Sequence, residues 1–227
     1  MNLVLILVEV IVVFSTLIFV NKFLGKYGVI SFVGVCTVLA NIFTAKSMML
    51  FGDISTTCGT VLFASTFLAT DILTENYGKK FATKAIYVGF LSNLLLIITS
   101  QLNLYYSPAV WSFEVHDAEK VLFMMSLRVT ISSMIMYFIS NMVDVYLYDK
   151  LKEKTGSKYM WLRNNVCTIL CNGLENFFFM YGAFLFVPGY SVTTIFTMAL
   201  TTTIIEAVIG LMDTPFLYLS KVWKFKE

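Results

Sequence analysis

The sequence is short of charged residues. Asp, Glu, Lys and Arg make up 13% of its 227 residues, whereas about 25% is usual in soluble domains. Proline and histidine are also scarce, with three and one respectively, while 58% of the residues are hydrophobic and the mean hydropathy is +0.80. This composition excludes an ordinary soluble domain and indicates an integral membrane protein.

The usual sets of reactive residues are missing as well. Cys167 and Cys171 lie one helical turn apart, and Cys36 and Cys58 lie in or beside other apolar runs. The four cysteines therefore suggest packing residues and not a disulfide framework. The sole histidine, His116, has no histidine or cysteine partner nearby in sequence, so we expect no metal site. No phosphate-binding loop is visible, and we expect neither a cofactor nor a nucleic-acid partner.

What the sequence does contain is a series of apolar runs long enough to cross a bilayer. These runs predict an all-α integral membrane protein, a compact polytopic bundle of about seven transmembrane helices forming one domain over residues 1–227. The first run lacks the basic region and cleavage site of a signal peptide, so we expect it to be retained. The seven predicted helices are 3–20, 29–51, 54–75, 81–106, 119–148, 160–187 and 191–220.

The basic residues are distributed unevenly over the connectors. Only Lys46, Lys120 and Arg128 of the sixteen fall outside the first, third and fifth connectors, the adjoining helix ends and the C-terminal tail. The positive-inside rule then predicts an N-terminus outside and a C-terminus in the cytoplasm. The acidic segment Glu114–Glu119 is expected to be an extracytoplasmic loop, and Gly52-Asp53 a tight turn.

Two glutamates lie halfway along predicted helices, Glu175 in 160–187 and Glu206 in 191–220. A carboxylate exposed to hydrocarbon is costly, so both should face the protein interior. Asn172 and Asn176 share a helical face with Glu175. Together these side chains suggest a binding site for a ligand that donates hydrogen bonds or carries positive charge.

A second polar group ends the third run, where Asp71, Thr74 and Glu75 share one helical face. Asp71 is one turn deeper than Glu75, and Glu75 has an open alternative as a headgroup-level acid beside Lys79 and Lys80. Carboxylates at such depths usually mark a functional path.

Other polar residues interrupt the remaining helices and have two open interpretations each. Asn41 and Asn141 suit either a site or hydrogen bonds between helices. Arg128 suits ligand contact or an ion pair with a glutamate, and Asp144 suits a gate or a solvated rim. Asp213 ends a polar stripe on the last helix, just before Thr214-Pro215.

From Leu39 to Tyr218 the sequence resembles the queuosine precursor transporters, also called vitamin uptake transporter-like proteins. The resemblance rests on the order and spacing of several motifs, none sufficient alone. They are Leu39-Ala-Asn-Ile42 with Lys46, Thr70-Asp-Ile-Leu-Thr-Glu75 with Tyr77-Gly-Lys-Lys80, Arg128, Asn141 with Asp144, Trp161-Leu-Arg-Asn-Asn165 with Thr168, and Asp213-Thr-Pro-Phe216.

The resemblance implies uptake of a 7-deazaguanine for tRNA modification, either the cyano or aminomethyl precursor or the base queuine. It also implies a homodimer in the bacterial inner membrane and a six-helix core at 28–220, so that residues 1–21 form an added helix. The chain departs from the family's common pattern in the sixth helix, where Asn172, Glu175 and Asn176 replace Gln-x-x-Asp-Thr. Glu206 stands where many members have lysine, which moves the site toward negative charge.

A guanine-like base offers N–H groups to a carboxylate, acceptors to Asn or Arg, and faces to aromatic rings. We expect Glu175 or Asp71 to read the base edge and Glu206 to face the amine of an aminated ligand. The predicted substrate-binding residues are Asn41, Asp71, Thr74, Arg128, Asn141, Asn172, Glu175, Asn176 and Glu206. The predicted gating or structural polar residues are Glu75, Asp144, Arg163, Asn164 and Asp213.

Two other functions remain open from the sequence. The chain also suits the substrate-binding subunit of an energy-coupling-factor importer, which alone would bind tightly but accumulate little. An intramembrane enzyme using Glu175 and Glu206 as acid and base is disfavoured, because no nucleophile–base pair or metal-ligand set accompanies them. Our leading prediction is a transporter, not an enzyme, that works by alternating access around a site at mid-membrane.

Overall fold

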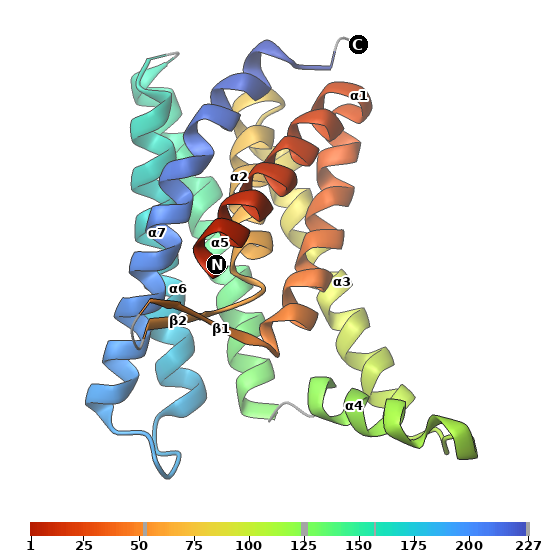
Figure 1. The fold of residues 1–227 in the computed structure, drawn as a ribbon. Coiled ribbons are helices and arrows are strands. Elements are labelled where there is room, and N and C mark those ends of the chain that lie inside the picture. Colours follow the sequence, from red (N-terminus) through yellow and green to blue (C-terminus); the bar gives the residue numbers. More distant parts are fainter. Residues whose placement is uncertain (52–53, 124–126, 157, 226–227) are drawn as a thin grey trace.

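A computed structural model describes the chain except residues 52–53, 124–126, 157 and 226–227. Long helices run side by side in a bundle that carries a small hairpin (Figure 1). In chain order the elements are α1 (Asn2–Thr44), β1 (Ser47–Phe51), β2 (Ile54–Thr57), α2 (Thr60–Asn76), α3 (Lys79–Leu104), η1 (Val110–Ser112), α4 (Phe113–Phe123), α5 (Leu127–Thr155), α6 (Met160–Phe184) and α7 (Val192–Val222).

The bundle has two distinct ends. The hairpin, α4 and the α6–α7 loop lie at one of them, which we call the hairpin end (bottom of Figure 1). The α2–α3 and α5–α6 turns and the end of α7 lie at the other, which we call the charged end because most of the lysines lie in or beside these segments.

The helices have the length and surface of membrane spans. Four of the described helical segments are long and apolar enough to cross a bilayer: Asn2–Thr44, Lys79–Leu104, Arg128–Thr155 and Val192–Val222. Large apolar side chains are exposed along the outside of the bundle, for example Leu91, Leu95 and Val208, as expected of a surface that meets lipid. The all-α membrane class is confirmed, and the total of seven spans stays a prediction.

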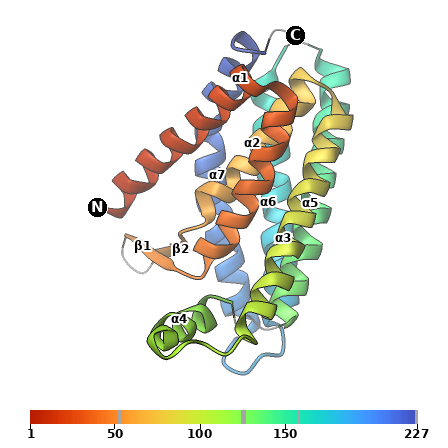
Figure 2. The same cartoon turned by 90° about the vertical axis from the view of Figure 1, so that its right-hand side faces the viewer.

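The break predicted between the helices 3–20 and 29–51 is a sharp bend within one continuous element in the structure. α1 runs through both and bends sharply at Gly25, whose φ of 59° and ψ of −152° are not helical. Glycine adopts a positive φ at little cost because it has no Cβ. The two arms of α1 therefore descend from a common bend at the charged end (Figure 2).

The N-terminal arm is part of the core and not a peripheral addition. Phe14 is fully buried, and its ring meets that of Phe216 edge-on at 5.4 Å. Asn21 is also fully buried; its amide nitrogen donates to the Ser220 carbonyl at 3.1 Å, and its oxygen accepts from the Tyr77 hydroxyl at 3.0 Å.

The prediction of helix throughout 29–51 and 54–75 was wrong at the junction of the two. α1 ends at Thr44, and β1 pairs antiparallel with β2 in a register that places Ser47 opposite Thr57. A short apolar run does not by itself distinguish strand from helix, and the β-branched residues of β2 favour a strand. The expected turn at Gly52-Asp53 lies outside the described residues.

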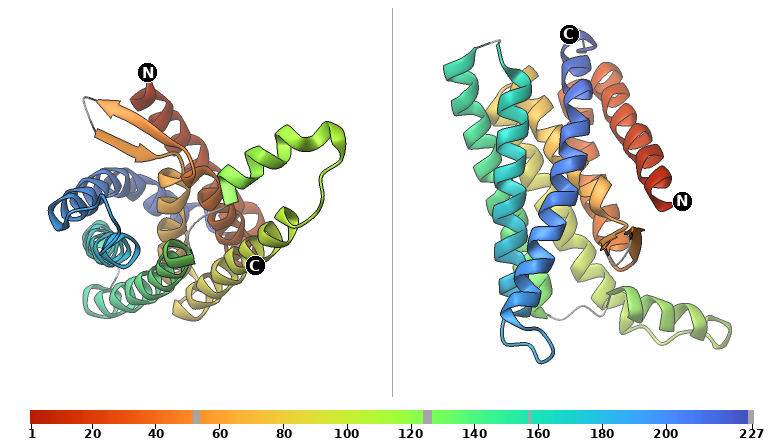
Figure 3. Two further views of the ribbon diagram at one scale, coloured as in Figure 1. Left: turned by 90° about the horizontal axis from the view of Figure 1, so that it is seen from below. Right: turned by 60° about the vertical axis from the view of Figure 1, so that its left-hand side comes forward.

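The predicted helix 119–148 begins and ends too early, and the predicted loop 114–119 is helical. α4 takes up Phe113–Phe123 and α5 begins at Leu127. α4 has no buried residue and extends away from the bundle (Figure 3). Its Asp117 and Lys120 pair at 3.0 Å, one turn apart, which is a local contact that a surface helix can form without a core.

α2 is the central helix. It packs against α1, α3, α5 and α7, and all but one of its residues from Thr60 to Thr74 are buried. At 1.5 Å per residue its 17 residues span about 25 Å, less than the roughly 30 Å of a bilayer core. The space beyond its N-terminus is occupied by the hairpin and by a cavity.

Candidate functional site

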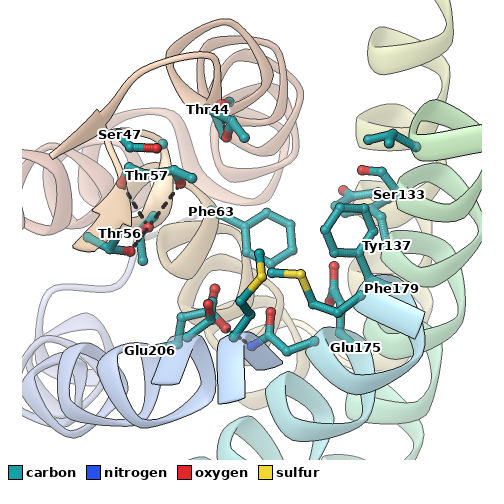
Figure 4. Close-up of a pocket in the computed structure, with 18 of the residues that line it drawn as sticks. Thr44, Ser47, Thr56, Thr57, Phe63, Ser133, Tyr137, Glu175, Phe179 and Glu206 are labelled. Carbon is teal, nitrogen blue, oxygen red and sulfur yellow. Dashed lines mark hydrogen bonds between the residues drawn. The ribbon is translucent and has the colours of Figure 1, made fainter. Parts of the chain in front are cut away.

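A cavity of about 750 Å³ opens into the hairpin end of the bundle (Figure 4). Its wall comes from the end of α1, both strands, the start of α2, the second half of α3, the start of α5, the end of α6 and the first half of α7. A volume of this size suits a small organic molecule.

Two carboxylates lie at the wall of this cavity, Glu175 on α6 and Glu206 on α7. Both are buried, and each carboxylate accepts a hydrogen bond from a nearby side chain. Ser140 of α5 donates a hydrogen bond to Glu175, and the Asn176 amide donates to Glu206 Oε2 at 2.6 Å. Asn176 therefore links α6 to the Glu206 carboxylate of α7 at the cavity wall.

The electrostatic character of the cavity follows from these two residues. Among the described residues that line it, Glu175 and Glu206 are the sole charged side chains, and the rest are threonines, serines, asparagines, methionines and apolar groups. A buried carboxylate without a cation partner attracts hydrogen-bond donors and positive charge. The cavity thus suits a ligand with several N–H groups.

Aromatic rings supply the apolar part of the wall. Phe63, Tyr137 and Phe179 come from α2, α5 and α6 and surround the space above the glutamates (Figure 4). Tyr137 is placed by Gly89 of α3: a Cβ at this glycine would lie 2.0 Å from the Tyr137 hydroxyl. The close approach of α3 therefore allows the ring to occupy its position, and rings so placed can stack on a planar ligand.

Of the predicted substrate-binding residues, four line the cavity: Asn41, Glu175, Asn176 and Glu206. Asn41 is the most distant of these in sequence. Its amide nitrogen donates to the Thr37 carbonyl at 2.9 Å, which holds the side chain against α1.

The other five predicted substrate-binding residues do not line the described cavity wall. Asp71, Thr74, Asn141 and Asn172 are buried among the helices; the Thr74 hydroxyl donates to the Thr70 carbonyl at 2.9 Å. Arg128 is exposed at the start of α5, and its Nε donates to the Gly182 carbonyl at 2.7 Å. The arginine thereby ties α5 to the end of α6.

Glu75 organises a cluster of charges that closes the opposite, charged end. Its carboxylate accepts from Arg163 Nη2 at 2.7 Å and from Lys221 Nζ at 2.9 Å, and Lys152 Nζ lies 4.0 Å away. The Tyr148 hydroxyl is 3.4 Å away. These contacts join α2, α5, α6 and α7, and we call the four charged residues the Glu75 cluster.

Further hydrogen bonds strengthen this closure. Lys152 Nζ also donates to the Thr74 and Glu75 carbonyls, at 2.8 Å each. Arg163 Nη1 donates to three oxygens of the α5–α6 connection at 3.0 Å, those of Thr155, Gly156 and Lys158. The charged end is therefore bonded across four helices, while the hairpin end holds an open cavity.

The remaining predicted polar residues lie between the cavity and the Glu75 cluster. Asn164 Nδ2 donates to Asp213 Oδ1 at 2.6 Å, linking α6 to α7. Asp144 is fully buried on α5. The predicted gating set thus occupies the middle and the charged end of the bundle, separate from the cavity wall.

Several lining residues were missed in the sequence. Tyr137 could have been found, because it precedes Asn141 by four residues and so shares its face. Three threonines of the hairpin and the start of α2 could not have been found: Thr56, Thr57 and Thr60. Their segment was predicted to be helical, and a helix prediction does not indicate that these residues line a cavity. Their hydroxyls form a hydrogen-bonded group, with 2.9 Å between the oxygens of Thr56 and Thr60.

The helical bundle has an apolar outer surface and a polar cavity at one end, and ion pairs and hydrogen bonds close its other end. This is the architecture of a membrane transporter. Comparison with known families agrees. The profile described as "Putative vitamin uptake transporter" matches residues 57–220. The chain belongs to this family of transporters, as the sequence motifs indicated.

A relative with a described role covers most of the chain. The "Probable queuosine precursor transporter" of Bacillus subtilis (strain 168) is 31% identical over 201 residues, which are 88% of this chain and 86% of that protein. No solved structure matches the chain.

Proposed function

We propose that this protein imports a 7-deazaguanine, either a queuosine precursor or queuine, for tRNA modification. The observation that carries the proposal is the pair of carboxylates, Glu175 and Glu206, in an aromatic-lined cavity whose described wall contains no cation. A guanine-like base has N–H donors on one edge and two stacking faces. The described role of the Bacillus relative supports the same ligand class.

The expected pose follows from the cavity wall. Glu175 accepts from the N–H groups of the base edge, and the rings of Phe63, Tyr137 and Phe179 contact its faces. Glu206 then faces the substituent, where the aminomethyl precursor and queuine carry a protonatable amine. Asp71, the other residue predicted to read the base edge, is not part of the wall, so this role falls to Glu175.

The mechanism we propose is alternating access. The open hairpin end and the closed Glu75 cluster correspond to one of its two states, with the ligand site exposed on a single side. The distribution of lysines supports a cytoplasmic charged end in the bacterial inner membrane, so this state would face outward. A homodimer stays a prediction from the family resemblance.

The proposal is tested in bacterial cells that can neither make nor import deazaguanines. The chain is expressed, each precursor and queuine is supplied separately, and queuosine is measured in the tRNA. We expect rescue by at least one ligand, and loss of rescue in Glu175→Gln but not in the exposed Glu153→Gln. Failure of the wild-type protein to rescue with any of them would contradict the proposal.

A second assay separates a transporter from the binding subunit of a larger importer. The purified chain is placed alone in liposomes with the ligand that rescues. A self-sufficient transporter exchanges labelled for unlabelled ligand across the membrane, whereas an isolated binding subunit only retains ligand at its own stoichiometry.

A further inference from the structure

Three levels of carboxylates run through the bundle. Glu175 and Glu206 lie at the cavity, and Glu75 lies at the charged end. Between these levels are three aspartates on three helices, Asp71 on α2, Asp144 on α5 and Asp213 on α7, with 0%, 0% and 1% exposure. Neither the ligand site nor the Glu75 cluster uses them.

Asp71 and Asp144 form the centre of this middle level. They interact with each other across the contact between α2 and α5. None of their four oxygens receives a hydrogen bond from an N–H or O–H group of the described chain. The side-chain oxygens of Asn141 and Asn164 are likewise buried without a donor, so the region has an excess of acceptors. Asp213 differs, because Asn164 donates to it.

The groups that surround the pair do not neutralise it. Asp213 faces it from α7, Tyr148 from α5, and Glu75 lies further along α2. On α6 the thiol of Cys171 lies against Asp144, with Cys167 one turn away.

A nearby cation, Arg163 on α6, is largely engaged by other groups. It donates to Glu75 and to the α5–α6 connection, and its Nε is buried without a hydrogen-bond partner.

Two facing carboxyls in a dry interior cannot both be ionised, and a proton shared between them satisfies one oxygen of each. The described residues include no group of three or more side chains placed to hold a metal ion. We propose that Asp71 and Asp144 form a proton-binding pair, and that this proton is the coupling ion of transport. The coupling rests on the proposed function, whereas the bound proton does not.

The positions of the two residues explain how the proton would act. Asp71 is one helical turn from Glu75 on α2, and Asp144 is two turns from Lys152 on α5. With the proton in place, one carboxyl donates to the other and α2 stays against α5, which keeps the Glu75 cluster assembled. After the proton leaves toward the charged end, two carboxylates repel across the same contact, and the cluster is pushed apart.

The bound proton is tested by infrared spectroscopy on the protein in membranes. A protonated carboxyl has a carbonyl stretch that an ionised one lacks. We expect this band at neutral pH in the difference between wild type and Asp144→Asn, and again with Asp71→Asn. The matched control is Glu153→Gln, an exposed residue, which should give no band. Absence of the band in both aspartate differences overturns the proposal.

The coupling is tested in liposomes with a ligand that exchanges. One pH unit corresponds to a factor of ten in proton activity, so symport with one proton should give about tenfold accumulation across that gradient. Asp144→Asn should still exchange ligand but should not accumulate it against the gradient. The asparagine amide donates to Asp71 in place of the bound proton, so transport no longer depends on that proton. If the wild-type protein exchanges ligand but accumulates none under the pH gradient, the proton coupling is overturned and the transport proposal stands. Absence of all exchange contradicts the transport proposal instead, and the infrared band still decides the proton pair.

Discussion

Replacing Glu75 with glutamine should open the charged end. The wild-type carboxylate pairs with Arg163 at 2.7 Å, and these side chains are 3% and 1% exposed. Removing one partner of a buried pair costs about 3–5 kcal/mol. We take about 3 kcal/mol, because Arg163 keeps its three bonds to the α5–α6 connection, and because Lys221 is 45% exposed and adds little. If the cluster exists solely in the closed state, the equilibrium shifts by a factor on the order of 100.

A native thiol reports the opening. Cys171 is 1% exposed and lies between the cavity and the Glu75 cluster, so its reaction with a membrane-impermeant thiol reagent requires access from one end. The background replaces Cys36, Cys58 and Cys167 with alanine. Reagent applied from the charged end should label Cys171 much faster in Glu75→Gln than in the parent.

The matched control is Glu153→Gln, which removes an exposed carboxylate from the same end and should leave the labelling rate unchanged. General destabilisation would raise labelling from both sides of the membrane, whereas opening of the charged end raises it from one. Equal rates in parent and Glu75→Gln would refute the assignment of the Glu75 cluster as the closure.

Three further changes test the cavity and the core. Glu206→Gln should weaken binding of the aminomethyl precursor by about 1.5–3 kcal/mol relative to the cyano one, measured by titration; equal losses would contradict the amine contact. Gly89→Ala should displace Tyr137 at a cost of about 1–3 kcal/mol and reduce affinity, whereas Gly173→Ala, whose Cβ would meet its nearest neighbour at 3.7 Å, should change neither. Asn21→Ala should lower thermal stability in detergent by about 1–3 kcal/mol through its lost buried hydrogen bonds, and an unchanged melting temperature would argue against an integrated N-terminal arm.

The sequence predicted the fold class and part of the cavity for the same reason. Apolar runs report burial in lipid, and a carboxylate within such a run must turn inward, which places Glu175 and Glu206 correctly at an internal site. Depth along a helix is readable in this way. The direction in which a side chain points around the helix axis is harder to read: Asp71, predicted to contact the ligand, is buried outside the cavity wall, and its contact with ligand stays a prediction.

The hairpin was not predictable from hydropathy. Residues 47–57 are apolar enough to continue a helix, and their pairing as strands depends on the space that the short α2 leaves free. The bend of α1 is different, because Gly25 lies within the break that was predicted between the helices 3–20 and 29–51.

The hairpin also bears on how ligand choice can change among relatives. Its strands form one wall of the cavity, yet they belong to a connection between α1 and α2 and not to the helical frame. Connections tolerate substitution and changes of length better than packed helices do. We therefore expect new ligand specificities to arise first by substitutions within residues 47–57, while the helices and the Glu75 cluster stay the same.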